Sequence, residues 1–243
     1  AKRGNKVVLS PNTHCYFDFY QSKDIQFEPF AIGGYTPVEK VYAFEPVPSA
    51  LDEEQAKLVI GAQCNLWTEY IKTFSQIQYM ILPRLAALCE VQWTEPQLKD
   101  YESFKERIPA MFAIYDKYGY NYAKHLCDVN ATYTPDPKKK ALEVTFTTLN
   151  DREIRYTTDG NEPDANSILY QGPFTVDSDV VIKAASFSNG VKSRTISDTI
   201  NVNVASFTKA IFNTTPANGY AFNGAQTLVD GIVGGTTNYR PGR

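Results

Sequence analysis

Residues 58–69 have the sequence Leu58-Val59-Ile60-Gly61-Ala62-Gln63-Cys64-Asn65-Leu66-Trp67-Thr68-Glu69. The stretch begins with a short apolar run that shows no clean alternation of polar and apolar side chains. Such a run is typical of a strand buried on both faces of a parallel sheet. Residues 6–10 form a second run of this kind near the start of the chain. We therefore predict two parallel strands, one in each run.

The connection between these two runs is long, polar and rich in aromatic residues. It contains Gly33-Gly34-Tyr35-Thr36-Pro37 and, at residues 51–57, an acidic segment suited to a short helix. Ordinary connections between elements are much shorter. We expect a functional loop at the C-terminal end of the first strand.

Two helical patterns follow the second run. Residues 74–92 are apolar almost all round, which predicts a buried helix that Pro83 kinks or breaks. A second helix is expected near 101–118 with Gly119 as its C-terminal cap, because apolar residues there recur at helical spacing: Phe104, Ile108, Phe112 and Tyr115. The order strand, long loop, strand, helix, helix predicts the last two units of a (β/α)8 barrel.

The pattern changes near residue 130, where short alternating segments begin, separated by turn signals such as Asp159-Gly160. These features predict a small antiparallel β-sandwich. The fold class is therefore α/β plus all-β. We expect a barrel segment at 1–127, the sandwich at 128–204, and the truncated start of a third domain at 205–243.

Composition excludes some classes of function. A formal net charge of −3 and a pI near 5.5 leave no basic surface for a nucleic-acid partner. No apolar run approaches the ~20 residues that span a bilayer, and the N-terminus lacks signal-peptide features. The chain opens at Ala1 without an initiator Met. We expect a piece of a longer protein, so the missing signal says nothing about location.

The cysteines are Cys15, Cys64, Cys89 and Cys127. They form no CxxC pair and have no His at metal-ligand spacing, which argues against zinc. We expect no metal or cofactor. The sequence favours four small buried thiols, and a Cys15–Cys64 disulfide is the alternative because both residues follow predicted strands.

Two segments place an aromatic residue and a carboxylate at matching positions. Tyr16-Phe17-Asp18 follows the first predicted strand, and Trp67-Thr68-Glu69 follows the second. Residues i and i+2 of an extended chain point to the same side, so each segment offers one ring and one acid to a common space. Rings cover the apolar face of a pyranose, and carboxylates accept hydrogen bonds from its hydroxyls. The alternative is that both rings are barrel core and both acids are solvated.

The residues themselves resemble a known family. Asn5-Lys6-Val7-Val8-Leu9-Ser10-Pro11 leading to Tyr16-Phe17-Asp18, then residues 61–69, then residues 82–94 resemble the end of the catalytic barrel of glycoside hydrolase family 20. Residues 155–163 and 170–174 are similar to the chitobiase-type domain that follows such barrels. The tail resembles the start of a discoidin-like carbohydrate-binding domain.

The resemblance implies an exo-β-N-acetylhexosaminidase that removes terminal β-linked N-acetylglucosamine or N-acetylgalactosamine from glycans. In that family the 2-acetamido carbonyl of the substrate is the nucleophile. By resemblance, Tyr16 orients the acetamido group, Asp18 and Glu69 bind sugar hydroxyls, and Trp67 forms part of the pocket wall. The resemblance also implies an extracytoplasmic location and the rest of the barrel as a partner.

One departure from the family pattern limits what this chain does alone. The family carries its general acid in an Asp-Glu pair after two glycines, whereas Gly33-Gly34 precedes Tyr35, and Asp52-Glu53 lies in a polar loop. We expect the isolated chain to be inactive, and a non-catalytic glycan-binding fragment is the alternative function. We also expect structural roles for three further residues: His14 as a hydrogen-bonded loop residue, His125 at a helix end, and Arg84 in a buried ion pair or on barrel carbonyls.

Overall fold

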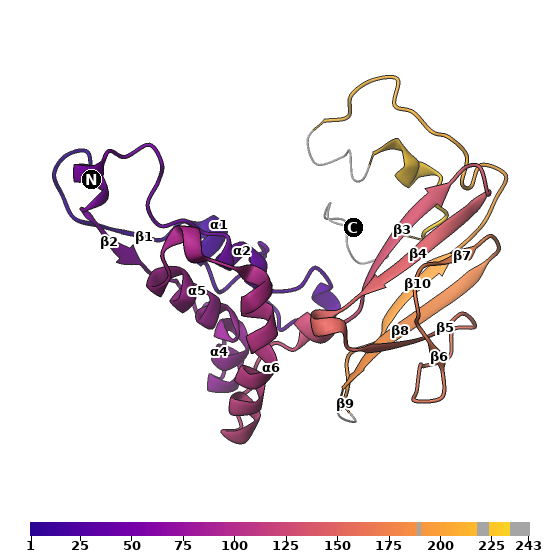
Figure 1. Cartoon of the computed structure of the whole chain (residues 1–243), viewed down its shortest axis with the longest axis horizontal. Coiled ribbons are helices and arrows are strands. Elements are labelled where there is room, and N and C mark those ends of the chain that lie inside the picture. The colour runs from indigo at the N-terminus through magenta and orange to yellow at the C-terminus, as the bar shows by residue number, and fades with distance from the viewer. Residues whose placement is uncertain (189–190, 218–223, 234–243) are drawn as a thin grey trace. The chain divides into compact units, whose positions relative to one another are not determined.

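The computed structural model describes residues 1–188, 191–217 and 224–233, and the chain divides into two compact units (Figure 1). The first unit is Ala1–Ala123 and the second is Lys124–Arg243. Among the described residues, no helix is long and apolar enough to cross a membrane.

The first unit contains the two predicted parallel strands, β1 (Val7–Leu9) and β2 (Val59–Ala62). The long connection between them is not a plain loop, since it folds into short helices held by local hydrogen bonds. Its elements are α1 (Asn12–Cys15), the 3-10 helix η1 (Ile25–Phe27), α2 (Val38–Tyr42) and α3 (Glu53–Ala56).

Helices cover the rest of the first unit. They are α4 (Phe74–Ile81), α5 (Arg84–Trp93), the 3-10 helix η2 (Pro96–Leu98) and α6 (Tyr101–Lys117). The apolar segment 74–92 is thus two helices, because Pro83 has no N–H to continue the first one. Helix α6 buries its four predicted apolar residues, and Gly119 follows it with a φ of 66°.

The helical segment is less buried than its sequence predicts. The Phe74 side chain is 72% exposed and Cys89 is also exposed. The expectation that all four cysteines are buried is therefore wrong for Cys89, which lies on the outer face of α5. Cys15 at the end of α1 and Cys64 just after β2 are free thiols, so the alternative of a Cys15–Cys64 disulfide is not borne out.

The second unit is an antiparallel sandwich. One sheet has the order β3–β4–β7, and the other has the order β10–β8–β5–β6 with β9 paired to β8. The strands are β3 (Asn130–Asp136), β4 (Ala141–Thr147), β5 (Glu153–Thr157), β6 (Ile168–Leu169), β7 (Phe174–Val176), β8 (Val180–Ser188), β9 (Val191–Lys192) and β10 (Ile196–Ile200). The 3-10 helices of this unit are η3 (His125–Cys127), η4 (Leu149–Asp151) and η5 (Ala225–Leu228). The predicted fold class, α/β followed by all-β, is confirmed.

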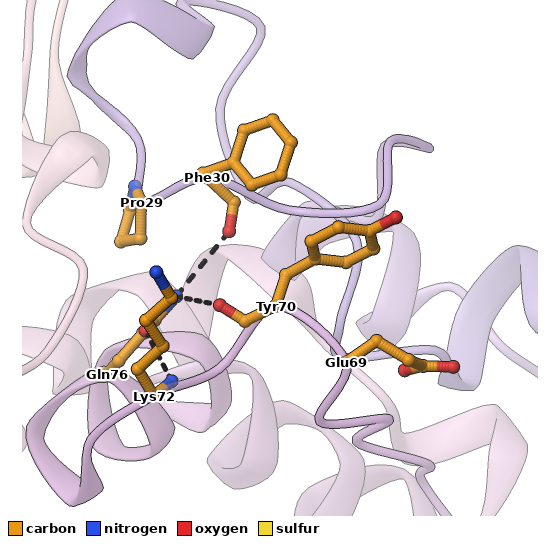
Figure 2. A pocket seen from close by; sticks show the side chains of 6 residues that line it. All are labelled: Pro29, Phe30, Glu69, Tyr70, Lys72 and Gln76. Atoms are coloured by element: carbon orange, nitrogen blue, oxygen red, sulfur yellow. Dashed lines mark hydrogen bonds between the residues drawn. The ribbon is translucent and has the colours of Figure 1, made fainter.

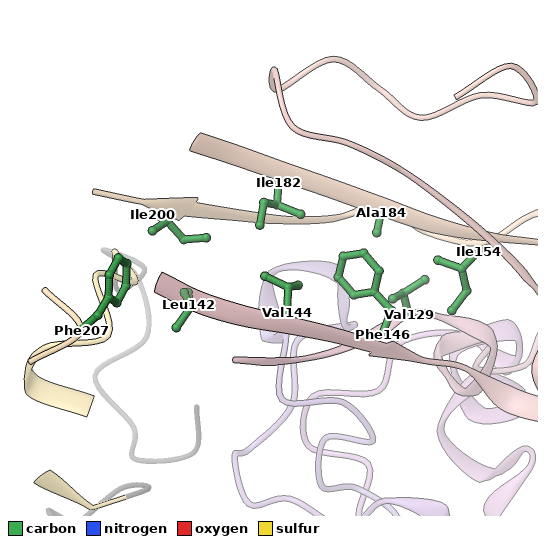
Figure 3. Close-up of a cluster of buried hydrophobic side chains, with 9 residues drawn as sticks. All are labelled: Val129, Leu142, Val144, Phe146, Ile154, Ile182, Ala184, Ile200 and Phe207. Atoms are coloured by element: carbon green, nitrogen blue, oxygen red, sulfur yellow. The ribbon is translucent and has the colours of Figure 1, made fainter. Parts of the chain in front are cut away.

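The sandwich core forms between the inner faces of the two sheets. Leu142, Val144 and Phe146 alternate along β4 and point toward the opposite sheet (Figure 3). That sheet contributes Ile154, Ile182, Ala184 and Ile200. The alternation that the sequence shows near residue 142 therefore marks the buried face of a strand.

Residues beyond 204 also contribute to this core. Phe207 is 1% exposed and lies at one end of the cluster in Figure 3, and its N–H donates to the Val229 carbonyl at 2.7 Å. Ile232 pairs with Ile200, the last residue of β10. The predicted start of a discoidin-like domain stays a prediction, since residues 218–223 and 234–243 of it lie outside the described residues.

Replacement of Phe207 by Ala should destabilise the second unit by about 3–5 kcal/mol, because it leaves a cavity at the end of a packed core. Urea denaturation followed by far-UV circular dichroism measures this loss. Val204→Ala is the matched control, since Val204 is fully exposed. Equal stabilities of the two variants would contradict the placement of Phe207 in the core.

Candidate functional site

The site is built where the backbones of the two strands continue to pair past their ends. Gln63 N–H donates to the Leu9 carbonyl at 3.0 Å, and Asn65 N–H donates to the Cys15 carbonyl at 2.8 Å. Phe17 N–H then donates to the Asn65 carbonyl at 2.7 Å, so Tyr16 and Asn65 form a parallel bridge. This register brings the segments 16–18 and 67–69 side by side.

The two predicted aromatic residues meet in this space. The ring centroids of Tyr16 and Trp67 are 6.4 Å apart and the rings are inclined by 61°. Phe19 packs against Tyr16 from another side, at 5.5 Å between ring centroids. Trp67 keeps 52% of its surface exposed. Part of its indole therefore remains accessible to a ligand.

The two predicted carboxylates have different surroundings. Asp18 is only 5% exposed, whereas Glu69 is exposed. Burial raises the pKa of Asp18, the nearby Glu69 raises it further, and hydrogen bonds from the backbone of Asp18 and Trp67 oppose the rise. Among the described residues, no donor reaches the buried Oδ1 atom of Asp18. A buried acceptor without a donor is costly unless a ligand or water supplies one.

A pocket of about 420 Å³ opens beside Glu69. Its lining residues are Pro29, Phe30, Glu69, Tyr70, Lys72 and Gln76 (Figure 2). The Phe30 and Tyr70 rings meet edge to face, with centroids 5.1 Å apart. Gln76 joins the two loops, since its side-chain amide donates to the carbonyls of Tyr70 at 3.2 Å and Phe30 at 3.5 Å. The pocket walls are thus fixed by hydrogen bonds between distant parts of the chain.

Sequence reasoning did not select this pocket. Tyr70 directly follows Glu69, but the i, i+2 argument points to residues 67 and 69 only. Phe30 lies in the long connection, and no spacing rule relates residue 30 to residue 70. The one available signal was the aromatic content of that connection.

The residues expected to be structural take the following places. His14 lies in α1 rather than in a loop, stacks on Phe44 at 5.3 Å between ring centroids, and shares a 2.8 Å hydrogen bond with Thr13. Burial, and secondarily the Lys40 charge, lowers the pKa of His14. His125 begins the short 3-10 helix η3 rather than ending a helical segment. Across the described ranges, no group of three or more His, Cys, Asp or Glu residues could hold a metal ion.

Rings and carboxylates at the C-terminal ends of parallel strands are typical of the class of β/α folds that carry their sites at this face. Comparisons with known proteins narrow this class. Residues 1–96 match the catalytic domain of glycosyl hydrolase family 20, and residues 134–199 match the chitobiase/beta-hexosaminidase C-terminal domain. These two segments thus match part of a family 20 catalytic domain and a domain of the hexosaminidase C-terminal type, and the resemblance found in the sequence is confirmed.

Individual relatives agree with these matches. The chain is 34% identical over 196 residues to a beta-hexosaminidase of Porphyromonas gingivalis, covering 79% of this chain and 25% of that protein. It is 30% identical over 125 residues to a beta-N-acetylhexosaminidase of Cellulomonas fimi, covering 50% of this chain and 24% of that protein. A solved exo-beta-N-acetylglucosaminidase of Vibrio harveyi is 34% identical with a TM-score of 0.45, over 51% of this chain and 19% of that one. The chain therefore spans about a quarter of the length of these two curated relatives.

Replacing Asp18 by Asn should stabilise the chain at neutral pH. The folded-state pKa of Asp18 is raised, so its contribution to stability is greatest when the carboxyl is protonated and is lost as pH rises through that pKa. An uncharged amide removes this penalty. Urea denaturation of the variant and the unsubstituted chain should show a difference at about pH 7 that shrinks toward about pH 3.

The exposed acid Glu106 provides the control, since Glu106→Gln should leave stability nearly unchanged. An Asp18→Asn variant no more stable than the unsubstituted chain at neutral pH would contradict the burial argument.

Proposed function

We propose that this chain is part of an exo-β-N-acetylhexosaminidase that hydrolyses terminal non-reducing β-linked N-acetylglucosamine or N-acetylgalactosamine. The observation that carries the proposal is the convergence of Tyr16, Asp18, Trp67 and Glu69 on two paired strand ends. These strand ends lie within the segment that matches a family 20 catalytic domain. The hexosaminidase relatives support the same reaction.

The proposed mechanism is substrate-assisted and retains configuration. The acetamido carbonyl oxygen attacks C1 while the leaving oxygen accepts a proton, and water later opens the cyclic oxazolinium. The Tyr16 hydroxyl donates a hydrogen bond to the attacking carbonyl oxygen and holds it below C1. Asp18 and Glu69 accept hydrogen bonds from sugar hydroxyls, and Trp67 covers an apolar sugar face.

The pocket beside Glu69 fits the group attached to the departing oxygen. Its two rings, Phe30 and Tyr70, present apolar surface next to an acid proposed to bind the sugar. Lys72 and Gln76 add polar groups at the rim. Under this proposal the pocket receives the aglycone or the next sugar of a glycan chain. The proposed enzyme acts on such chains outside the cytoplasm.

The proton donor must come from elsewhere in a complete catalytic domain, because no Asp-Glu pair in this chain follows two glycines. Exposed apolar surface on the two strands also supports the rest of the catalytic barrel as the partner of this chain. Val8 of β1 is 48% exposed and Ile60 of β2 is 59% exposed, whereas parallel sheets are normally covered on both faces. We propose that the remaining strands and helices of the barrel cover this surface.

The 243-residue chain alone should therefore show no turnover of p-nitrophenyl N-acetyl-β-glucosaminide, because nothing protonates the leaving group. The same chain within a protein that carries a complete family 20 catalytic domain should be active. Release of p-nitrophenol measures both. Turnover by the isolated chain would place the acid within it, and an inactive complete protein would leave only glycan binding.

Within that complete protein, Tyr16→Phe should lower kcat by about 10–1,000-fold and raise KM less, because the lost donor acts on an oxygen whose charge changes during the reaction. Glu69→Gln should act mainly on binding, at about 1.5–3 kcal/mol for a charged hydrogen bond. Steady-state kinetics of both variants provides the comparison. A Tyr16→Phe effect confined to KM would reduce Tyr16 to a wall of the pocket.

A further inference from the structure

Arg84 is the largest side chain that is fully buried among the described residues, with 0% exposure at the start of α5. All of its hydrogen bonds go to backbone carbonyls. Nη1 donates to Phe19 and Thr36, each at 3.0 Å, and Nε donates to Met80 at 3.0 Å. Nη2 donates to the carbonyls of Phe17 and Met80. The guanidinium therefore binds the carbonyls on both sides of Asp18.

The charge of Arg84 persists at neutral pH despite its burial. Burial lowers the pKa of Arg84 to about 9, while Glu28 and Asp18 oppose the decrease. Glu28 has other partners, since it accepts from the Tyr79 hydroxyl at 2.9 Å and from the Gln21 N–H at 3.4 Å. Among the described residues, Oδ1 of Asp18 has no donor. The positive charge thus lies close to a carboxylate with unused acceptor capacity.

We propose that Arg84 is a positioning residue for sugar binding, which fixes the backbone around Asp18 through two carbonyls and whose positive charge favours the ionised form of this buried carboxylate. The inference rests on the proposed function, in which Asp18 accepts hydrogen bonds from sugar hydroxyls. Stacking of the guanidinium on the Phe17 ring, at 4.7 Å from Cζ to the centroid, holds the same segment from a second side.

The two parts of this role are separable. The carbonyl contacts need the planar fork of donors that only arginine provides. The charge acts on the ionisation of Asp18, which burial and Glu69 oppose and which the backbone of Asp18 and Trp67 and the Arg84 charge favour. The other titratable groups that face Arg84 are Glu28, Cys64 and Tyr79.

The test uses the complete enzyme with Arg84→Lys and Arg84→Met. Arg84→Lys keeps a charge but loses the fork, so KM should rise about 10-fold with kcat changed less. Arg84→Met also loses the charge, so the acidic limb of the kcat/KM profile should additionally move to higher pH by about 1 unit. Arg107→Met is the control, because Arg107 is an exposed residue of α6 that forms an ion pair with Glu90 of α5.

An acidic limb that stays at its wild-type position in a folded Arg84→Met enzyme would overturn the proposal, as would unchanged KM values in both variants. If Arg84→Met does not fold, Arg84→Gln provides the uncharged variant. The titration of a ¹³C-labelled Asp18 carboxyl in the variants should likewise move to higher pH. This measurement needs no turnover, so it decides the role of Arg84 even if the unsubstituted enzyme is inactive and the proposed function fails.

Discussion

The buried guanidinium of Arg84 constrains the backbone of the first unit. A charge removed from water needs a donor–acceptor network around it, and here backbone carbonyls from three separate segments provide the acceptors. Those carbonyls must all point toward the guanidinium at the same time. The loop after β1, the segment before α2 and the end of α4 are therefore fixed relative to one another, and Tyr16 and Asp18 lie on the first of these segments.

Parallel pairing beyond β1 and β2 converts this fixed loop into a site. Because the bridge between Tyr16 and Asn65 sets the register, Tyr16 lies beside Trp67, and the Trp67 amide approaches the Asp18 carboxylate. Burial makes Asp18 a costly residue for the fold and a strong acceptor for a hydroxyl ligand. The same physical feature thus opposes stability and, under the proposed function, favours sugar binding.

Several features were predictable from the sequence because they follow local rules. Apolar runs without polar alternation predicted β1 and β2, and apolar residues at helical spacing predicted α6. Pro83 predicted the break between α4 and α5. The i, i+2 rule gave the pairing of Tyr16 with Asp18 and of Trp67 with Glu69. The helix predicted within residues 51–57 is present as α3, but α1 with His14, η1 and α2 were missed, because helices of three to five residues show no helical periodicity. The exposure of Cys89 was missed because burial depends on neighbours that are distant in sequence.

The sequence by itself determined which rings and carboxylates follow the two strands, since side-chain type and strand periodicity are local properties. Only the tertiary structure decided how each of them behaves. Asp18 and Glu69 are both carboxylates after a strand, yet the first is buried with a raised pKa and the second is exposed. Burial and electrostatic environment are sums over residues far apart along the chain, and no local pattern contains them.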